Sequence, residues 1–161
     1  MRRTTLAVTL TALVSLVAVP SPARADEELD CQGTVRDLVV SPGLSTEPNS
    51  GVYHARQQTG TLECGTLKGT FGMDGRYGTE DPDSCQSGGE GWGVFVYTFE
   101  GEEEVRETFT VRFGPNTEGT DAGHFDGEHL SGKYTFTGTE GNCVTSPITK
   151  GDMSFFGTLT R

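Results

Sequence analysis

The chain has 161 residues, with 23 Asp+Glu against 12 Lys+Arg. Residues 1–25 hold three of the arginines and no acid, so residues 26–161 carry 9 basic and 23 acidic side chains, a net charge of −14. Such a surface repels phosphate backbones and anionic membranes, and we therefore expect no nucleic-acid partner.

The first 25 residues have the three parts of a secretory signal peptide. Arg2 and Arg3 precede an apolar run over 6–19, and Ala23-Arg24-Ala25 is a small-x-small cleavage motif. The run is too short to cross a bilayer comfortably, and no later run is long enough, so we predict no membrane span. We predict a signal peptide over 1–25 and a single β domain over 26–161, exported to the extracellular space. An N-terminal membrane anchor is the alternative.

The exported part contains all 23 glycines, which punctuate short runs rich in Val, Thr, Phe and Tyr. No window has the apolar stripe of an amphipathic helix. About eight strands are expected, with a long surface loop over 75–91. In chain order the strands are Gly33–Val40, Val52–Gln58, Thr61–Cys64 continuing toward Phe71, Gly91–Phe99, Val105–Phe113, Gly123–His129, Lys133–Thr139 and Met153–Leu159. This spacing predicts a single antiparallel β-barrel, with a two-sheet β-sandwich as the alternative.

Four cysteines lie in the exported part, and an even number in an oxidising compartment indicates two disulfides. Sequence alone allows three connectivities. An antiparallel hairpin centred on residues 47–48 would place Cys31 opposite Cys64, within reach of a disulfide. We therefore predict the pair Cys31–Cys64 and, by elimination, Cys85–Cys143.

Short motifs around these cysteines resemble small exported Cys/Gly-rich β proteins of actinomycete bacteria. The motifs are "CQGT", "SPGL", "TGTLEC", "DSC", "YTFEG", "GHFDGEHLSGKYTF", "GNC" and a closing "GTL". The resemblance implies an exported β-rich domain of bacterial origin and no assigned activity. The chain departs from that group at Tyr97 and Phe99, where tryptophan is expected.

Residues 91–113 read as a β-hairpin whose first strand is apolar on both faces. A two-residue turn at Glu100-Gly101 pairs Val96 with Val105 and Trp92 with Phe109; a longer turn pairs Phe95 with Phe109. We favour the short turn because glycine accepts a positive φ. The core face would then carry Trp92, Val94, Val96, Val105, Phe109, Val111 and Phe113.

The other face of this hairpin is the candidate binding site. Phe95, Tyr97 and Phe99 would form an aromatic strip for an extracellular protein or a saccharide, and Arg106 and Arg112 would add polar contacts. The alternative is that loops or a neighbouring strand cover the strip, or that the sheet curls and buries both faces. Aromatic side chains on strands more often belong to a core than to a site.

The sequence gives weaker evidence for a metal site or a catalytic site. Asp74, Glu80, Asp81 and Asp83 could supply oxygen ligands for Ca²⁺, but Arg76 breaks the calcium-loop pattern, so a solvated acidic loop is expected instead. No nucleophile-elbow or zinc-helix motif is present. We predict no catalytic residue, no metal and no cofactor.

Three functions remain open. The leading one is a non-catalytic protein that binds a partner or ligand through one sheet face. The second is a small barrel enzyme or ligand carrier whose interior holds the chemistry. The third is a secreted inhibitor of extracellular hydrolases that inserts the loop Thr79–Gly91 into its target.

Overall fold

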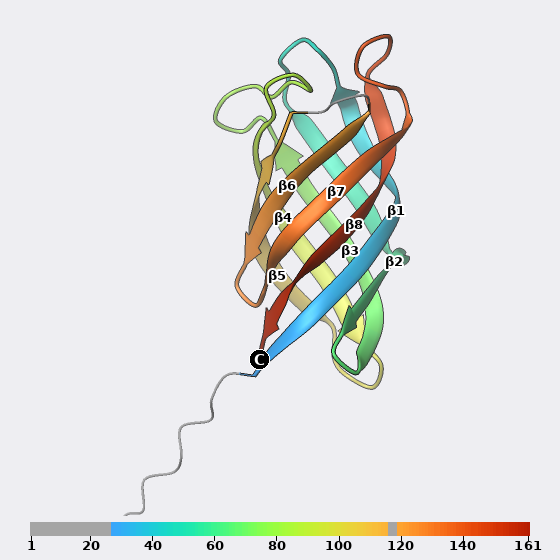
Figure 1. Ribbon diagram of the computed structural model, residues 1–161, viewed down its shortest axis with the longest axis vertical. Coiled ribbons are helices and arrows are strands. Elements are labelled where there is room, and N and C mark those ends of the chain that lie inside the picture. Colours follow the sequence, from blue (N-terminus) through green and yellow to red (C-terminus); the bar gives the residue numbers. More distant parts are fainter. Residues whose placement is uncertain (1–26, 116–118) are drawn as a thin grey trace, which may run out of the picture.

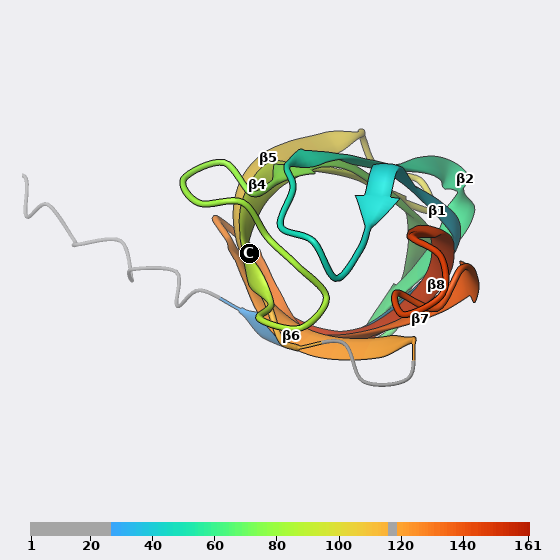
Figure 2. The ribbon, with the colours of Figure 1, turned by 90° about the horizontal axis from the view of Figure 1, so that it is seen from above.

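The computed structural model describes residues 27–115 and 119–161. The signal peptide predicted over 1–25 lies outside the described residues. The fold is all-β: eight strands form a closed antiparallel barrel in which each strand pairs with the next and the last pairs with the first (Figures 1 and 2). The predicted barrel is therefore confirmed. No helix in the described segments has the length and hydrophobicity needed to cross a membrane.

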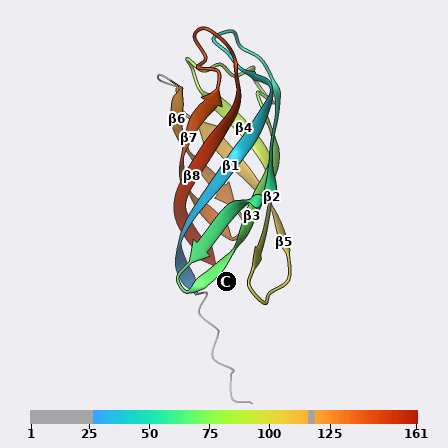
Figure 3. The same cartoon turned by 90° about the vertical axis from the view of Figure 1, so that its right-hand side faces the viewer.

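The strands follow one another without a crossover, and Figure 3 shows β8 beside β1 at the seam of the barrel. Their bounds are β1 Glu28–Leu44, β2 Gly51–Cys64, β3 Leu67–Tyr77, β4 Gly89–Phe99, β5 Val105–Phe113, β6 Thr120–Gly127, β7 Leu130–Glu140 and β8 Ile148–Thr160.

The barrel has two unlike ends. At one end, called the loop end, lie the connections 45–50, 78–88 and 141–147, together with residues 114–115 and 119 that flank β5 and β6. At the other, called the turn end, lie the shorter connections 65–66, 100–104 and 128–129. The backbones of Glu27 and Arg161 pair there through two hydrogen bonds of 3.1 and 3.0 Å.

Both predicted disulfides are confirmed. Cys31 and Cys64 are cross-strand partners of β1 and β2, with Cα atoms 4.1 Å apart, as the hairpin argument requires. Cys85 and Cys143 join the loops 78–88 and 141–147 across the loop end.

Several predicted strand boundaries are wrong. The segments Val52–Gln58 and Thr61–Cys64 are one strand, β2, interrupted by a bulge between Ala55 and Gly60. The predicted continuation of Thr61–Cys64 toward Phe71 belongs to a separate strand, β3, which begins at Leu67. The predicted loop over 75–91 is shorter, because β3 continues to Tyr77 and β4 begins at Gly89.

The predicted register of the β4–β5 hairpin is also wrong. Val96 pairs with Arg106 and Tyr97 with Val105, because the connection runs over 100–104 and is longer than two residues. This places Phe109 opposite Gly93 and not opposite Trp92 or Phe95. A glycine leaves room for the Phe109 ring on the inner face, which a second large ring would not.

The two apolar faces of β4 therefore have different surroundings. Phe95, Tyr97 and Phe99 are buried in the barrel interior. On the outer face, Val96 is also buried, whereas Trp92 is 47% exposed. The β2 bulge packs on this part of the outer surface, since Gln57 Nε2 donates a 2.8 Å hydrogen bond to Thr98 Oγ1.

Inside the barrel, aromatic rings lie over glycines of the neighbouring strand. The interior of an eight-stranded barrel is only just wide enough for its side chains. At five registered pairs, a methyl group on the glycine would come within 3.0 Å of the aromatic side chain. The pairs are Gly33–Phe155, Gly51–Tyr77, Gly75–Tyr53, Gly93–Phe109 and Gly123–Tyr134. Five of the 23 glycines are thus explained by the aromatic packing.

We predict that Gly75→Ala lowers the free energy of unfolding by about 1–3 kcal/mol, because the added methyl group overpacks the core. Its carbon would lie 2.2 Å from Tyr53 Cζ. In a Tyr53→Leu background the same substitution should cost clearly less, which a double-mutant cycle by chemical denaturation measures. An equal cost in both backgrounds would contradict the steric explanation.

Candidate functional site

The structure separates the five residues predicted to bind a ligand. Phe95 lines an internal cavity. Tyr97 and Phe99 lie deeper, toward the turn end, in edge-to-face contact with ring centroids 5.8 Å apart. The guanidinium of Arg161 covers Phe99 at 5.9 Å. The aromatic strip is therefore interior and does not form an outer surface.

The two arginines of the predicted site are on the outside of the barrel. Arg106 pairs with Glu104 at 2.9 Å, and Arg112 pairs with Glu90 at 2.7 Å; all four side chains are largely exposed. They share no surface with the three aromatic side chains, so the predicted five-residue site does not exist as one site.

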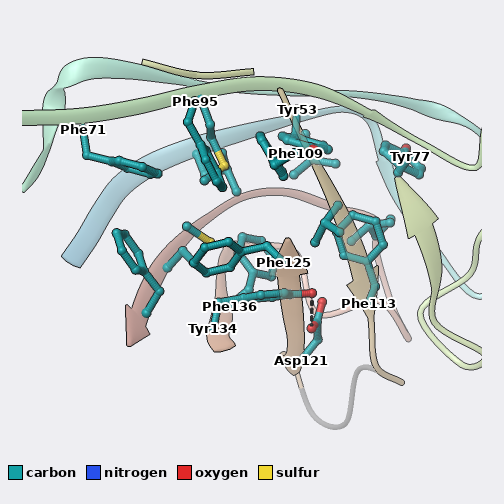
Figure 4. Close-up of a pocket in the computed structure, with 17 residues that line it drawn as sticks. Tyr53, Phe71, Tyr77, Phe95, Phe109, Phe113, Asp121, Phe125, Tyr134 and Phe136 are labelled. Atoms are coloured by element: carbon teal, nitrogen blue, oxygen red, sulfur yellow. Dashed lines mark hydrogen bonds between the residues drawn. The ribbon is translucent and has the colours of Figure 1, made fainter. Parts of the chain in front are cut away.

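The interior instead holds a cavity of about 50 Å³ between the middle of the barrel and the loop end (Figure 4). A buried water needs about 10–15 Å³ of such space, so the cavity has room for roughly three to five non-hydrogen atoms. Apolar and aromatic side chains dominate its wall. The lining residues are Leu38, Val40, Leu44, Tyr53, Phe71, Met73, Tyr77, Phe95, Phe109, Val111, Phe113, Asp121, Phe125, Tyr134, Phe136, Met153 and Phe155.

Tyr53 places a buried hydroxyl in this wall without a partner. The residue is 6% exposed, and its Oη is the one buried side-chain polar atom of the described residues that makes no hydrogen bond. Burial raises the pKa of Tyr53, so the hydroxyl keeps its proton. An unpaired buried hydroxyl costs about 1–3 kcal/mol.

Asp121 is the ionisable residue of the wall that can carry a charge near neutral pH. It lies at the start of β6, is 4% exposed, and accepts a 3.1 Å hydrogen bond from Tyr134 Oη. Burial raises the pKa of Asp121 to about 7, and the Tyr134 hydrogen bond opposes this rise. Figure 4 shows Tyr134 and Asp121 facing Tyr53 and Phe109 across the cavity.

Both ends of the barrel are covered. At the loop end, Asn49 and Asp83 exchange two backbone hydrogen bonds of 2.8 Å, which join the loops 45–50 and 78–88 (Figure 2). At the turn end, the buried carboxylate of Glu107 accepts hydrogen bonds from the backbone N–H groups of His129 and Leu130 at 2.7 and 3.1 Å. The cavity is therefore internal and not an open cleft.

The expected solvated acidic loop is only partly present. Asp83 is 5% exposed and accepts a 2.8 Å hydrogen bond from the N–H of Gly78, so it holds the loop in place. Asp74 lies on the outer face of β3 and contacts His54. Over 27–115 and 119–161, no three His, Cys, Asp or Glu side chains are grouped as metal ligands would be.

Most cavity residues were not singled out from the sequence, although a signal for them exists. Along β6, the residues Asp121, Gly123 and Phe125 alternate toward the interior. The strand was predicted to begin only at Gly123, which left Asp121 in a connecting segment. Glycines that pair with aromatic residues across strands also identify the inner face. Recognising these pairs in the sequence requires the correct strand register.

The fold and the cavity define a closed eight-stranded barrel with a mostly aromatic interior. Comparisons with family models, with curated proteins and with solved structures found no match.

We predict that Asp121→Asn changes how stability depends on pH. The carboxyl titrates near pH 4 when unfolded and near pH 7 when folded. Between these values the folded state binds the extra proton, so the contribution of Asp121 to stability falls as pH rises. Asp121→Asn has no carboxyl at this position, so its stability does not fall in this way. The free energy of unfolding of the variant relative to the parent should therefore increase by a few kcal/mol from about pH 4 to about pH 8.

Denaturant unfolding across that pH range measures the effect. Asp126→Asn is the matched control, because Asp126 is exposed on the same strand. Parallel stability curves for the parent and Asp121→Asn would contradict the prediction.

Proposed function

We propose that this chain is an exported, non-catalytic carrier that binds one small, mainly apolar organic molecule inside its barrel. The observation that carries the proposal is the unpartnered buried hydroxyl of Tyr53, a residue of the mostly apolar cavity wall. A filled core would normally replace such a tyrosine by phenylalanine, because buried polar groups are otherwise hydrogen-bonded. A ligand with one hydrogen-bonding group would satisfy the hydroxyl.

Export is part of the proposal. It is supported by the signal-peptide pattern over 1–25 and by the two disulfides, which form and persist in oxidising compartments. The relationship to exported Cys/Gly-rich β proteins of actinomycetes remains a proposal that rests on the motifs quoted above.

The inhibitor hypothesis has less support. An inhibitory loop should project from the molecule, as in tight complexes that insert a segment into a cleft. Asp83, Ser84 and Cys85 are instead buried against the loop end, and Cys85 N donates a 2.9 Å hydrogen bond to Ser45 O.

We predict that tert-butanol, with five non-hydrogen atoms, binds in the cavity. Met73 and Met153 both line it, so NMR of ¹³C-labelled methionine methyl groups reports directly on occupancy. Both signals should shift saturably. At a ceiling of about 1.5 kcal/mol per non-hydrogen atom, binding of so small a probe should be weak, in the millimolar to micromolar range.

Tyr53→Phe tests the role of the unpaired hydroxyl. The ligand-free variant should be more stable by about 1 kcal/mol, while tert-butanol should bind several-fold more weakly. Tyr77→Phe is the control: Tyr77 Oη donates to Asn49 Oδ1 at 2.9 Å, so its loss should destabilise the ligand-free protein. Methionine signals that move only linearly with probe concentration would contradict an internal binding site.

Binding through the outer face is the second candidate function, and its candidate residue is now Trp92. Trp92 is half exposed, and shallow hollows border its ring on both sides along the strands. Threonines, Arg112 and Asp126 surround it and could hydrogen-bond a sugar stacked on the indole.

If this outer face binds saccharide, Trp92→Ala should abolish retention of the protein on insoluble cell-wall polysaccharide. Stacking on an aromatic face supplies much of the affinity for such ligands, and the loss should be at least several-fold. Phe156→Ala is the control, because Phe156 is 67% exposed elsewhere on the barrel. Equal retention of both variants and the parent would exclude a saccharide site at Trp92.

A further inference from the structure

We propose that the ligand of the outer face is an extended polysaccharide chain without acidic groups, bound through about three consecutive sugars across the strands, and not a single sugar. This inference rests on the second candidate function and names the ligand class of the site at Trp92. It follows from the row of side chains to which Trp92 belongs and from the hollows beside its ring.

A row of outward-facing side chains crosses five neighbouring strands, β2 to β6, at the level of Trp92. Each member is the registered partner of the next: Val52, Arg76, Trp92, Thr110 and Asp126. All five are exposed. Registered partners on antiparallel strands lie directly opposite each other, so the row runs perpendicular to the strands.

The spacing of this row suits a polymer of sugars. Neighbouring strands lie about 4.8 Å apart, and each unit of an extended β-1,4-linked chain advances by a similar distance. A chain laid along the row therefore places one sugar over each strand that it touches. The indole of Trp92 would stack on the apolar face of the central sugar.

Hollows on both sides of the indole provide places for the two neighbouring sugars. Val52 and Arg76 border the hollow toward β2, and Thr110 and Asp126 border the hollow toward β6; Trp92 borders both. Arg76 can donate hydrogen bonds to sugar hydroxyls and Asp126 can accept them. Within the described residues neither side chain is held in an ion pair. A single sugar on the indole would leave both hollows empty.

The curvature of the barrel limits the contact to about three sugars. In a closed barrel of eight strands, each strand turns the surface by about 45° around the axis. A stiff extended chain lies along a tangent to this surface. It would therefore contact β4 and the strand on either side, β3 and β5, and leave the protein beyond them.

The charges around Trp92 disfavour an acidic chain. The basic side chains that border its hollows are Arg76, Arg112 and His124, and the acidic ones are Glu80, Glu90, Asp126 and Glu128. Arg112 is already neutralised by Glu90 at 2.7 Å. Residues 26–161 carry a net charge of −14, which repels a polyanion before it reaches the site.

Trp92 is the single tryptophan of the chain, so tryptophan fluorescence reports on this site alone. The test titrates the protein with N-acetylglucosamine and its β-1,4-linked dimer, trimer, tetramer and hexamer, and with the same series built from glucose. In the series that binds, affinity should rise by about fivefold with the second and again with the third sugar, the scale of one net hydrogen bond each. It should level off beyond the trimer. A β-1,4-linked mannuronate trimer, which is acidic, should not bind.

Two variants remove one polar group on each side of the indole. Arg76→Ala and Thr110→Val should each weaken binding of the trimer by about fivefold, and should leave binding of the single sugar within about twofold. Arg36→Ala is the matched control, because Arg36 is exposed on β1 and borders none of the three hollows. It should bind the trimer as the parent does.

The outcomes separate the two proposals. If the single sugar or the mannuronate trimer binds as tightly as the neutral trimer, this inference is overturned and the saccharide site stands. Affinity that keeps rising from trimer to hexamer would overturn the three-sugar contact. If neither series changes the fluorescence saturably, or if Trp92→Ala keeps its affinity for the trimer in calorimetry, the saccharide site and this inference are both overturned.

Discussion

The width of an eight-stranded barrel is the geometric limit from which the rest of this structure follows. Eight strands enclose a space that side chains of ordinary size nearly fill. This chain places aromatic rings at many of the inward positions, and each needs a neighbour small enough to lie beneath it. Glycine fills that need at Gly33, Gly75 and Gly93, among others. The strand register and the packing of the interior are therefore linked, because these rings lie over glycines of the neighbouring strands.

The same packing sets the chemistry of the interior. Aromatic rings exclude water, and a carboxyl group among them loses its hydration, which shifts the protonation of Asp121 into the neutral range. Among the buried side-chain polar atoms of residues 27–115 and 119–161, only the hydroxyl of Tyr53 has no partner. Natural cores seldom retain such groups without a role. In the middle of the barrel, the rings of Phe71 and Phe155 pack at a centroid distance of 4.9 Å.

The fold could be predicted from the sequence because alternating strands and glycine-containing turns are local patterns. It also reached the pair Cys31–Cys64, since a hairpin of the observed length brings these two residues together. It failed at the β4–β5 connection, where the length of a turn decides which side chains share a face. The observed register places Phe109 opposite Gly93 on the other strand, where the ring fits. This fit between two strands is not visible in either strand alone. For the same reason the aromatic strip predicted on an outer face lies in the interior, and the candidate binding site is now the interior cavity.

The pairing of Glu27 with Arg161 places both described ends of the barrel at the pole opposite the covering loops. A support, a label or a second domain joined to Glu27 or Arg161 would lie at the turn end and leave the loops of the loop end exposed to solvent. A protein immobilised at either end would therefore present the loop end of the barrel to the surrounding solution.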